Sequence, residues 1–153
     1  MEILFAISIT VLTFIAMEAV AWISHKYLMH GILWFFHEDH HQHNTNIDPF
    51  ERNDFFFLLF ATPGMLFVYL GSFNLSTIFW VGIGITLYGF AYFLIHDVFI
   101  HRRLKWLRNI DSRYFRAIRR AHKVHHRHFH KHDGECFGML WVPLKYFKKT
   151  KKN

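Results

Sequence analysis

The chain has 153 residues, of which 52% are hydrophobic and 20% aromatic, yet its formal net charge is +7. Apolar blocks that alternate with basic blocks argue against an ordinary soluble domain and are typical of a membrane protein with a basic face. The only cysteine, Cys136, excludes an internal disulfide framework and any zinc or iron–sulfur site built from cysteines. The length predicts a single domain over residues 1–153.

Three apolar runs are candidate membrane spans, at about residues 3–23, 55–71 and 75–95. The first run carries a single charge, Glu18, and at about 1.5 Å per residue it can cross about 30 Å of hydrocarbon. In the third run Gly82, Gly84 and Gly89 allow close contact between helices. We therefore predict an all-α integral membrane bundle with a histidine-rich helical cap.

The histidines follow a template that occurs twice in the chain. A pair with the spacing H-x4-H is followed by a triplet with the spacing H-x2-H-H, once near the first apolar run and again after the third. Because the same two spacings recur, we interpret these positions as metal ligands, with room for two metals. The ten positions are His25, His30, His37, His40, His41, His96, His101, His122, His125 and His126.

Helix geometry treats the triplets and the pairs differently. Residues at i, i+3 and i+4 share a helix face, so each triplet can present several nitrogens to one small volume. Residues at i and i+5 are about 140° apart at about 3.6 residues per turn. Each pair therefore either straddles the seam of the bundle or lies where the helix loosens locally, and the sequence leaves both alternatives open.

Imidazole nitrogen suits iron, zinc, copper and nickel, but neutral histidines bring no negative charge to balance two divalent ions. Nearby carboxylates are therefore expected to support the histidines and to orient their rings. For Glu18 an equal alternative is a hydrogen bond to neighbouring backbone or to Ser24. The candidate carboxylates are Glu18, Glu38, Asp39 and Asp97.

Other polar residues receive simpler interpretations. His43, His128, His130 and His132 lie outside the template, and we expect them to be solvated. The basic run at residues 102–120 follows a membrane span and matches no nucleic-acid-binding motif. It is interpreted as a surface facing lipids or an electron donor, with no nucleic-acid partner expected.

The two histidine regions must lie on one side of the membrane to form one site, and two apolar runs between them return the chain to that side. Lys and Arg are concentrated beside the histidines and absent from residues 71–76. The positive-inside bias therefore predicts that the histidines face the cytoplasm. A re-entrant second run and a fourth span near the C-terminus stay open as alternatives.

The histidine boxes and their flanks resemble the membrane fatty acid hydroxylase superfamily, and within it the bacterial β-carotene hydroxylases. The similarity covers nearly the whole chain. This chain differs from the family in its short tail after Phe147 and in its additional histidines after His126. The matching residues are Met17-Glu18, His25 to Gly31, Trp34, Asn53-Asp54, Tyr88-Gly89, Tyr92-Phe93, His96-Asp97, His122 to His126 and Phe137-Gly138.

The resemblance implies a non-haem di-iron mono-oxygenase of the bacterial inner membrane. Such an enzyme would use O2 and electrons from a ferredoxin-type donor to hydroxylate C3 of each β-ionone ring. A carotenoid drawn from the bilayer lipids would pass from β-carotene through β-cryptoxanthin to zeaxanthin. Two other functions remain open, a related hydroxylase of an acyl lipid or sterol and a non-enzymatic membrane protein that binds or transports metal.

Overall fold

The computed structural model describes residues 2–42 and 50–148, and within them every regular element is helical. Two elements, η1 and η2, are π-helical continuations of the α-helices before them, and η3 is a short 3₁₀ turn. The elements are α1 (Ile3–Ile23), η1 (Ser24–Ile32), α2 (Trp34–His41), α3 (Asp54–Gly71), α4 (Thr77–Phe93), η2 (Leu94–Ile100), α5 (Arg113–His125) and η3 (Leu144–Phe147).

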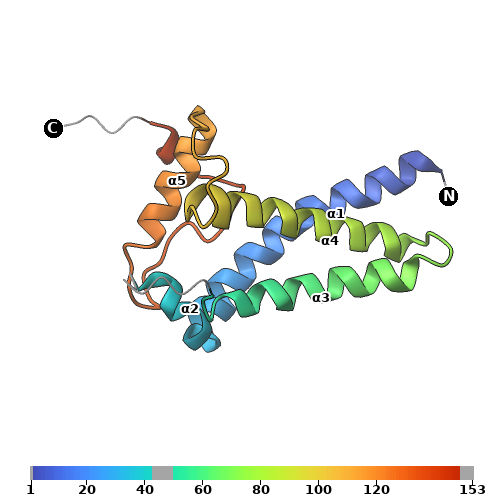
Figure 1. Cartoon of the computed structure of the whole chain (residues 1–153), viewed down its shortest axis with the longest axis horizontal. Helices are drawn as coiled ribbons and strands as arrows, with labels where there is room; N and C mark the ends of the chain where they lie inside the picture. The colour runs from blue at the N-terminus through green and yellow to red at the C-terminus, as the bar shows by residue number, and fades with distance from the viewer. Residues whose placement is uncertain (1, 43–49, 149–153) are drawn as a thin grey trace.

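Three helices are long and apolar enough to cross a membrane: Ile3–Ile32, Asp54–Gly71 and Thr77–Ile100. They form an elongated bundle, with α2 and α5 at one end and the N-terminal end of α1 and the α3–α4 turn at the other (Figure 1). The predicted all-α membrane bundle with a histidine-rich cap is therefore confirmed, and both histidine regions lie at the same end.

The two alternatives for the spans find no support in the described residues. The second run forms one continuous helix of 18 residues, as expected of a crossing segment. After η2, the only helices in the described part of the chain are the 13-residue α5 and the four-residue η3. Both are much shorter than the ~20 residues that a spanning helix needs.

Glycines let α4 pack tightly against its two neighbours. A Cβ atom on Gly82 would lie 2.6 Å from the backbone nitrogen of Val68 in α3, and one on Gly84 would lie 2.7 Å from the backbone oxygen of Thr10 in α1. Backbones can approach this closely only where a side chain is missing. Gly89, for which the same role was predicted, is different, because a Cβ atom there would meet nothing within 4 Å.

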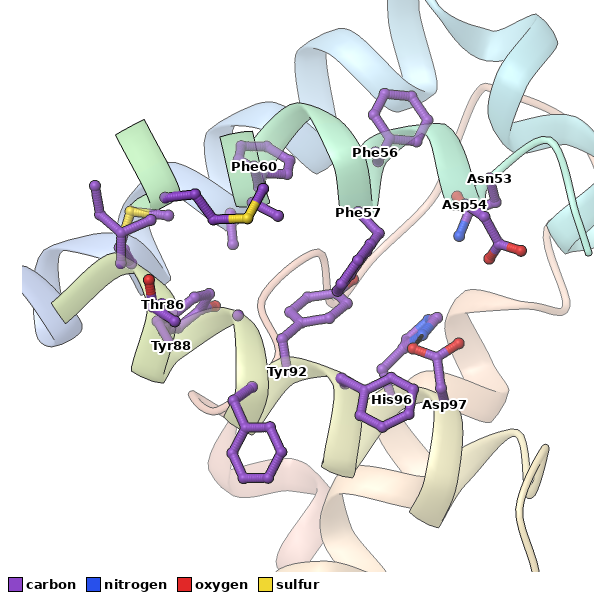
Figure 2. Close-up of a pocket in the computed structure, with 18 of the residues that line it drawn as sticks. Asn53, Asp54, Phe56, Phe57, Phe60, Thr86, Tyr88, Tyr92, His96 and Asp97 are labelled. Carbon is purple, nitrogen blue, oxygen red and sulfur yellow. Dashed lines mark hydrogen bonds and ion pairs between the residues drawn. The ribbon is translucent and has the colours of Figure 1, made fainter. Parts of the chain in front are cut away.

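Gly89 faces a cavity of about 440 Å³ between α1, α3 and α4. The walls are mainly apolar and include Phe57 and Phe60 of α3 and Tyr88 of α4 (Figure 2). The end nearest the cap is polar and is formed by Asn53, Asp54, His96 and Asp97. The cavity therefore connects the apolar interior of the bundle with the histidine-rich cap.

Candidate metal centre

Both H-x4-H pairs lie where an α-helix loosens into a π-helix. The backbone N–H of Leu33 donates to the carbonyl of Leu28, and that of His101 donates to the carbonyl of His96, so both bonds join residues five apart. This is the hydrogen-bond pattern of a π-helix. It brings the ring centroids of His25 and His30 to 5.2 Å and those of His96 and His101 to 4.5 Å. Local loosening is therefore the alternative that the structure adopts.

The two triplets lie on α2 and α5. The start of α5 is capped by Ser112, whose hydroxyl oxygen accepts a hydrogen bond from the N–H of Phe115 at 3.2 Å. The buried face of α5 combines small apolar residues such as Ala117 and Ala121 with His122 and His125. The remaining histidine, His126, is the residue that ends the helix. The prediction that each triplet shares a helix face is confirmed.

The histidines of the template form two adjacent clusters. In the first cluster, five imidazoles each offer a nitrogen within 4.8 Å of the others, and in the second cluster four do so. His96 lies beside the second cluster, with its Nε2 atom 3.1 Å from Nε2 of His40. The first cluster is His25, His30, His37, His41 and His125, and the second is His40, His101, His122 and His126.

Each triplet divides its histidines between the two clusters. His37 and His41 belong to the first cluster, whereas His40 between them belongs to the second. In α5 the pattern is reversed, since His125 alone crosses to the first cluster. At about 100° per residue, positions i and i+4 are about 40° apart, while i+3 lies about 60° to the other side of i. A triplet is therefore wide enough to reach two neighbouring centres.

In most of the histidines the Nδ1 atom contacts an oxygen, which leaves Nε2 for the cluster. A carbonyl oxygen cannot donate, so Nδ1 must carry the proton in four rings: His25 bonds to Phe137 (2.9 Å), His30 to Lys131 (3.3 Å), His41 to His128 (2.9 Å) and His125 to Glu135 (2.9 Å). All four acceptors belong to residues 128–137. This segment therefore fixes the tautomer of four of the five rings in the first cluster.

Side-chain oxygens perform the same role for three further histidines. Nδ1 of His37 donates to the amide oxygen of Asn53 at 2.6 Å. Nδ1 of His40 donates to the carboxylate of Glu51 at 2.8 Å. Nδ1 of His96 contacts the carboxylate of Asp97 at 3.3 Å. Such contacts orient a ligand ring and raise its basicity.

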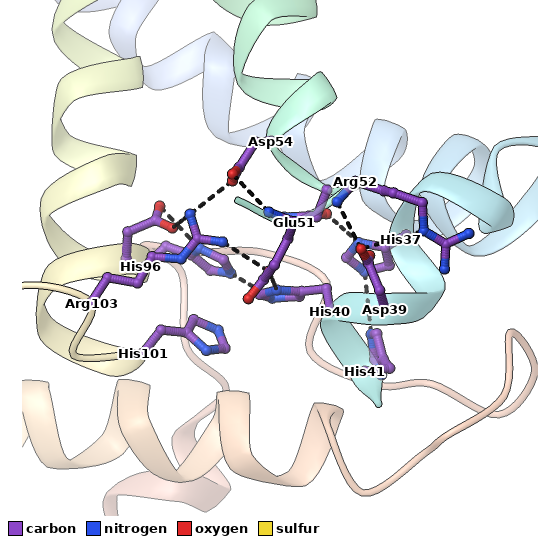
Figure 3. Close-up of polar contacts among 12 residues, drawn as sticks. His37, Asp39, His40, His41, Glu51, Arg52, Asp54, His96, His101 and Arg103 are labelled. Carbon is purple, nitrogen blue, oxygen red and sulfur yellow. Dashed lines mark hydrogen bonds and ion pairs between the residues drawn. The ribbon is translucent and has the colours of Figure 1, made fainter. Parts of the chain in front are cut away.

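Arg103 joins the carboxylates beside the second cluster (Figure 3). Its guanidinium lies 2.9 Å from Glu51, 2.8 Å from Asp54 and 3.3 Å from Asp97. Desolvation raises the pKa of Glu51, while the charge of Arg103 acts in the opposite direction. Arg103 therefore favours the ionised carboxylate that His40 needs as an acceptor.

The four predicted carboxylates have different surroundings. Asp97 contacts His96 as expected, but Asp39 instead accepts from the backbone N–H of Arg52 at 2.7 Å. Glu18 bonds to backbone, as in its alternative role, but the three N–H groups belong to Met139–Trp141 instead of the neighbouring chain or Ser24, and Tyr88 donates as well. Among the described residues, the carboxylate of Glu38 makes no hydrogen bond to a histidine of either cluster.

Several functional residues were missed from the sequence. Glu51 lies just before α3 and Arg103 lies in an irregular segment, so neither belongs to a periodic pattern. Asn53 was noticed only through the family resemblance. Of the histidines outside the template, His130 and His132 are exposed as predicted and His128 is half-buried. His43 lies outside the described residues.

Burial favours the neutral form of His40, His41 and His126. It lowers the pKa of His40 well below its usual value, and the neighbouring His101 and His96 lower it further. Burial is also the main cause that lowers the pKa of His41 to about 4 and that of His126 to about 2. The same direction holds for His37, His101, His122 and His125. Neutral imidazole is the form that binds a metal.

The donor set fits metal ions. Nε2 of His25 lies 3.1 Å from Nε2 of His37, although both rings carry their proton on Nδ1, so two lone pairs face each other. Two ligand nitrogens at about 2.1 Å from one ion, at right angles, are about 3 Å apart. The buried Nε2 of His126 also has no hydrogen-bond partner among the described residues. A cation in each cluster would satisfy these atoms.

Comparisons with known proteins agree with this architecture. A sequence model of the family described as Fatty acid hydroxylase matches residues 10–150. The chain is 36% identical to a protein from Pantoea ananas named β-carotene hydroxylase, over 88% of this chain and 76% of that protein. A protein of the same name from Paracoccus sp. (strain PC1) is 33% identical over 88% of this chain and 83% of its own length.

A chloroplastic protein from Gentiana lutea, named β-carotene 3-hydroxylase, is 35% identical over 84% of this chain, which matches 40% of that longer protein. No solved structure matches the chain significantly. The family match extends from α1, through both histidine clusters, to the segment that supplies the carbonyl acceptors of the first cluster. The chain therefore belongs to the fatty acid hydroxylase family.

Proposed function

We propose that this protein is a carotenoid 3-hydroxylase that converts β-carotene to β-cryptoxanthin and then to zeaxanthin. The observation that carries the proposal is the pair of adjacent histidine clusters at one end of three apolar helices. Relatives named β-carotene hydroxylase align with 88% of the chain. A substrate dissolved in the bilayer needs its catalytic centre at the end of membrane spans, where an end ring can reach it.

The proposed cofactor is a pair of iron ions, one held by each cluster, with His96 as a further ligand on the side of the second cluster. When bound, the irons would supply the redox chemistry by which O2, two electrons from a ferredoxin-type donor and two protons convert a C–H bond to C–OH and yield one molecule of water. The protein contributes position and protection. The free Nε2 atoms would hold the ions, the Nδ1 contacts fix the rings, and burial of most of the imidazoles excludes bulk water.

We further propose that the cap lies on the cytoplasmic side of a bacterial inner membrane. Lys and Arg are abundant around the histidines and absent from residues 71–76 at the opposite end of the bundle. Segments rich in Lys and Arg tend to stay on the cytoplasmic side of a membrane, so this distribution predicts that the cap faces the cytoplasm. A soluble electron donor would then approach the basic surface of the cap.

Hydroxylation of an acyl lipid is the second candidate, because the matching family is described as Fatty acid hydroxylase. Metal transport is disfavoured by the arrangement of the histidines. All ten template positions lie at one end of the bundle, whereas a transport path would place polar residues along the spans.

The test is pigment analysis of β-carotene-accumulating cells that express this chain, beside His40→Ala and His132→Ala variants. We expect cryptoxanthin and zeaxanthin from the parent and from His132→Ala, whose side chain is exposed, and unchanged β-carotene from His40→Ala. Unchanged β-carotene in the parent strain, with iron-loaded protein present, would contradict the proposal. Lipid analysis of the same cells then tests the acyl-lipid alternative.

A further inference from the structure

We infer that the cavity between α1, α3 and α4 binds one cyclic end group of the carotenoid while the rest of the molecule stays in the bilayer. The inference rests on the proposed function and adds the substrate site to it. The cavity volume of about 440 Å³ lies within the range of about 300–1,000 Å³ that is usual for ligand pockets. It is too small for a whole carotenoid, so the substrate must enter by one end.

The cavity opens sideways into the region that lipid tails occupy. Phe57, Met65 and Phe90 line it and are 58%, 59% and 60% exposed. All three lie on membrane-spanning helices, so their exposed faces contact hydrocarbon. An apolar molecule can therefore pass from the bilayer into the cavity without crossing water.

The inner end of the cavity lies next to residues that contact both clusters. His96 lines this end, and its Nε2 atom lies 3.1 Å from Nε2 of His40. Asn53 lines the same end and accepts the hydrogen bond from His37 of the first cluster. A ring seated in the cavity would thus be separated from the second cluster by one imidazole, with its long axis directed back into the membrane.

Glycine placement explains why the space exists. At the middle of α3 and α4 the two helices are in contact, since a Cβ atom on Gly64 would lie 3.1 Å from Ile85 and one on Gly82 would lie 2.9 Å from the Gly64 carbonyl. Closer to the cap this contact ends, and at Gly89 there is no side chain to fill the space between the helices. Aromatic residues then provide flat faces for a methylated ring, and Phe57 and Tyr92 both point into the cavity (Figure 2).

The test fills the cavity from two opposite walls. Gly89→Leu extends a side chain from α4, and Ala61→Leu does so from α3. Leu87→Phe is the matched control, because Leu87 lies on the same helix, is 48% exposed and does not line the cavity. Hydroxylated carotenoid, β-carotene retained by the purified protein and iron per chain are measured for each.

We expect both filling variants to lose about tenfold or more of the hydroxylation rate and to retain less β-carotene, with iron per chain unchanged. Leu87→Phe should keep the parent values. If the parent is active and both filling variants match Leu87→Phe at full iron content, the pocket assignment is overturned while the proposed function stands. A parent that binds iron but does not hydroxylate β-carotene overturns the proposed function itself. If one filling variant loses iron, the other variant alone tests the pocket assignment.

Discussion

The carboxylate of Glu18 in α1 accepts a hydrogen bond from the backbone N–H of Trp141, 123 residues further along the chain, at 2.9 Å. The same oxygen accepts from the N–H groups of Met139 and Leu140, and the other oxygen accepts from the hydroxyl of Tyr88. A charge inside a membrane span thus fastens the C-terminal segment to the bundle. Just before that contact, the Phe137 carbonyl holds His25 of the first cluster.

Replacement of Glu18 should therefore affect metal binding without any direct contact to a ligand. Glu18→Ala leaves three N–H groups without their acceptor, and we expect the free energy of unfolding to fall by about 1–3 kcal/mol. Iron affinity should fall as well, because residues 128–137 supply four of the Nδ1 acceptors. Glu2→Ala, at the start of the same helix, is the control. Unchanged unfolding and iron binding in Glu18→Ala would refute this role.

Each triplet contributes histidines to both clusters, and this arrangement predicts which double variants lose one iron and which lose two. The double variant His25→Ala/His125→Ala removes ligands from the first cluster only, so the purified protein should retain about one iron per chain. The double variant His125→Ala/His126→Ala removes neighbours in sequence that belong to different clusters, and it should lose both irons. Metal analysis of purified protein checks this. Equal iron loss in the two variants would show that the clusters do not bind metal independently.

Arg103 should tune the second cluster through the carboxylates that it contacts. Arg103→Gln removes the charge that holds Glu51 and Asp97 beside His40 and His96. Loss of such supporting contacts typically lowers metal affinity about 10–100-fold. Competition with a chelator measures this affinity, with the exposed Arg108→Gln as the control. A parent-like chelator midpoint in Arg103→Gln would contradict the prediction.

Acid should remove the metal and destabilise the fold together. Burial lowers the pKa of His40 and His41, to about 4 for His41, whereas free histidine titrates near about 6.5. As the pH falls below about 6.5, the unfolded chain takes up protons that the folded chain does not. The free energy of unfolding is therefore highest above that pH and falls as the pH approaches the lowered histidine pKa of the folded protein. Bound metal shifts the loss to lower pH. Iron content and melting temperature that stay constant down to pH ~4 would count against histidine ligation.

Some features follow from local sequence and were predictable without a structure. Hydropathy identified the three spans, since the bilayer demands long apolar helices wherever the chain crosses it. The repeated spacings selected ten histidines, all of which lie in or beside the two clusters. Spacing along a helix determines which side chains share a face, so this information is present in the sequence itself.

The division of those histidines between two centres depended on the tertiary structure. Helix geometry leaves a triplet about 100° wide, and only the position of the opposing helix decides that His40 and His125 cross to the other cluster. Glu51, Arg103 and the carbonyls of residues 128–137 are likewise brought to the site by irregular segments without periodicity. The cavity beside Gly89 arises where α3 and α4 lose contact. Contacts between residues far apart in the chain are properties of packing, and no local pattern records them.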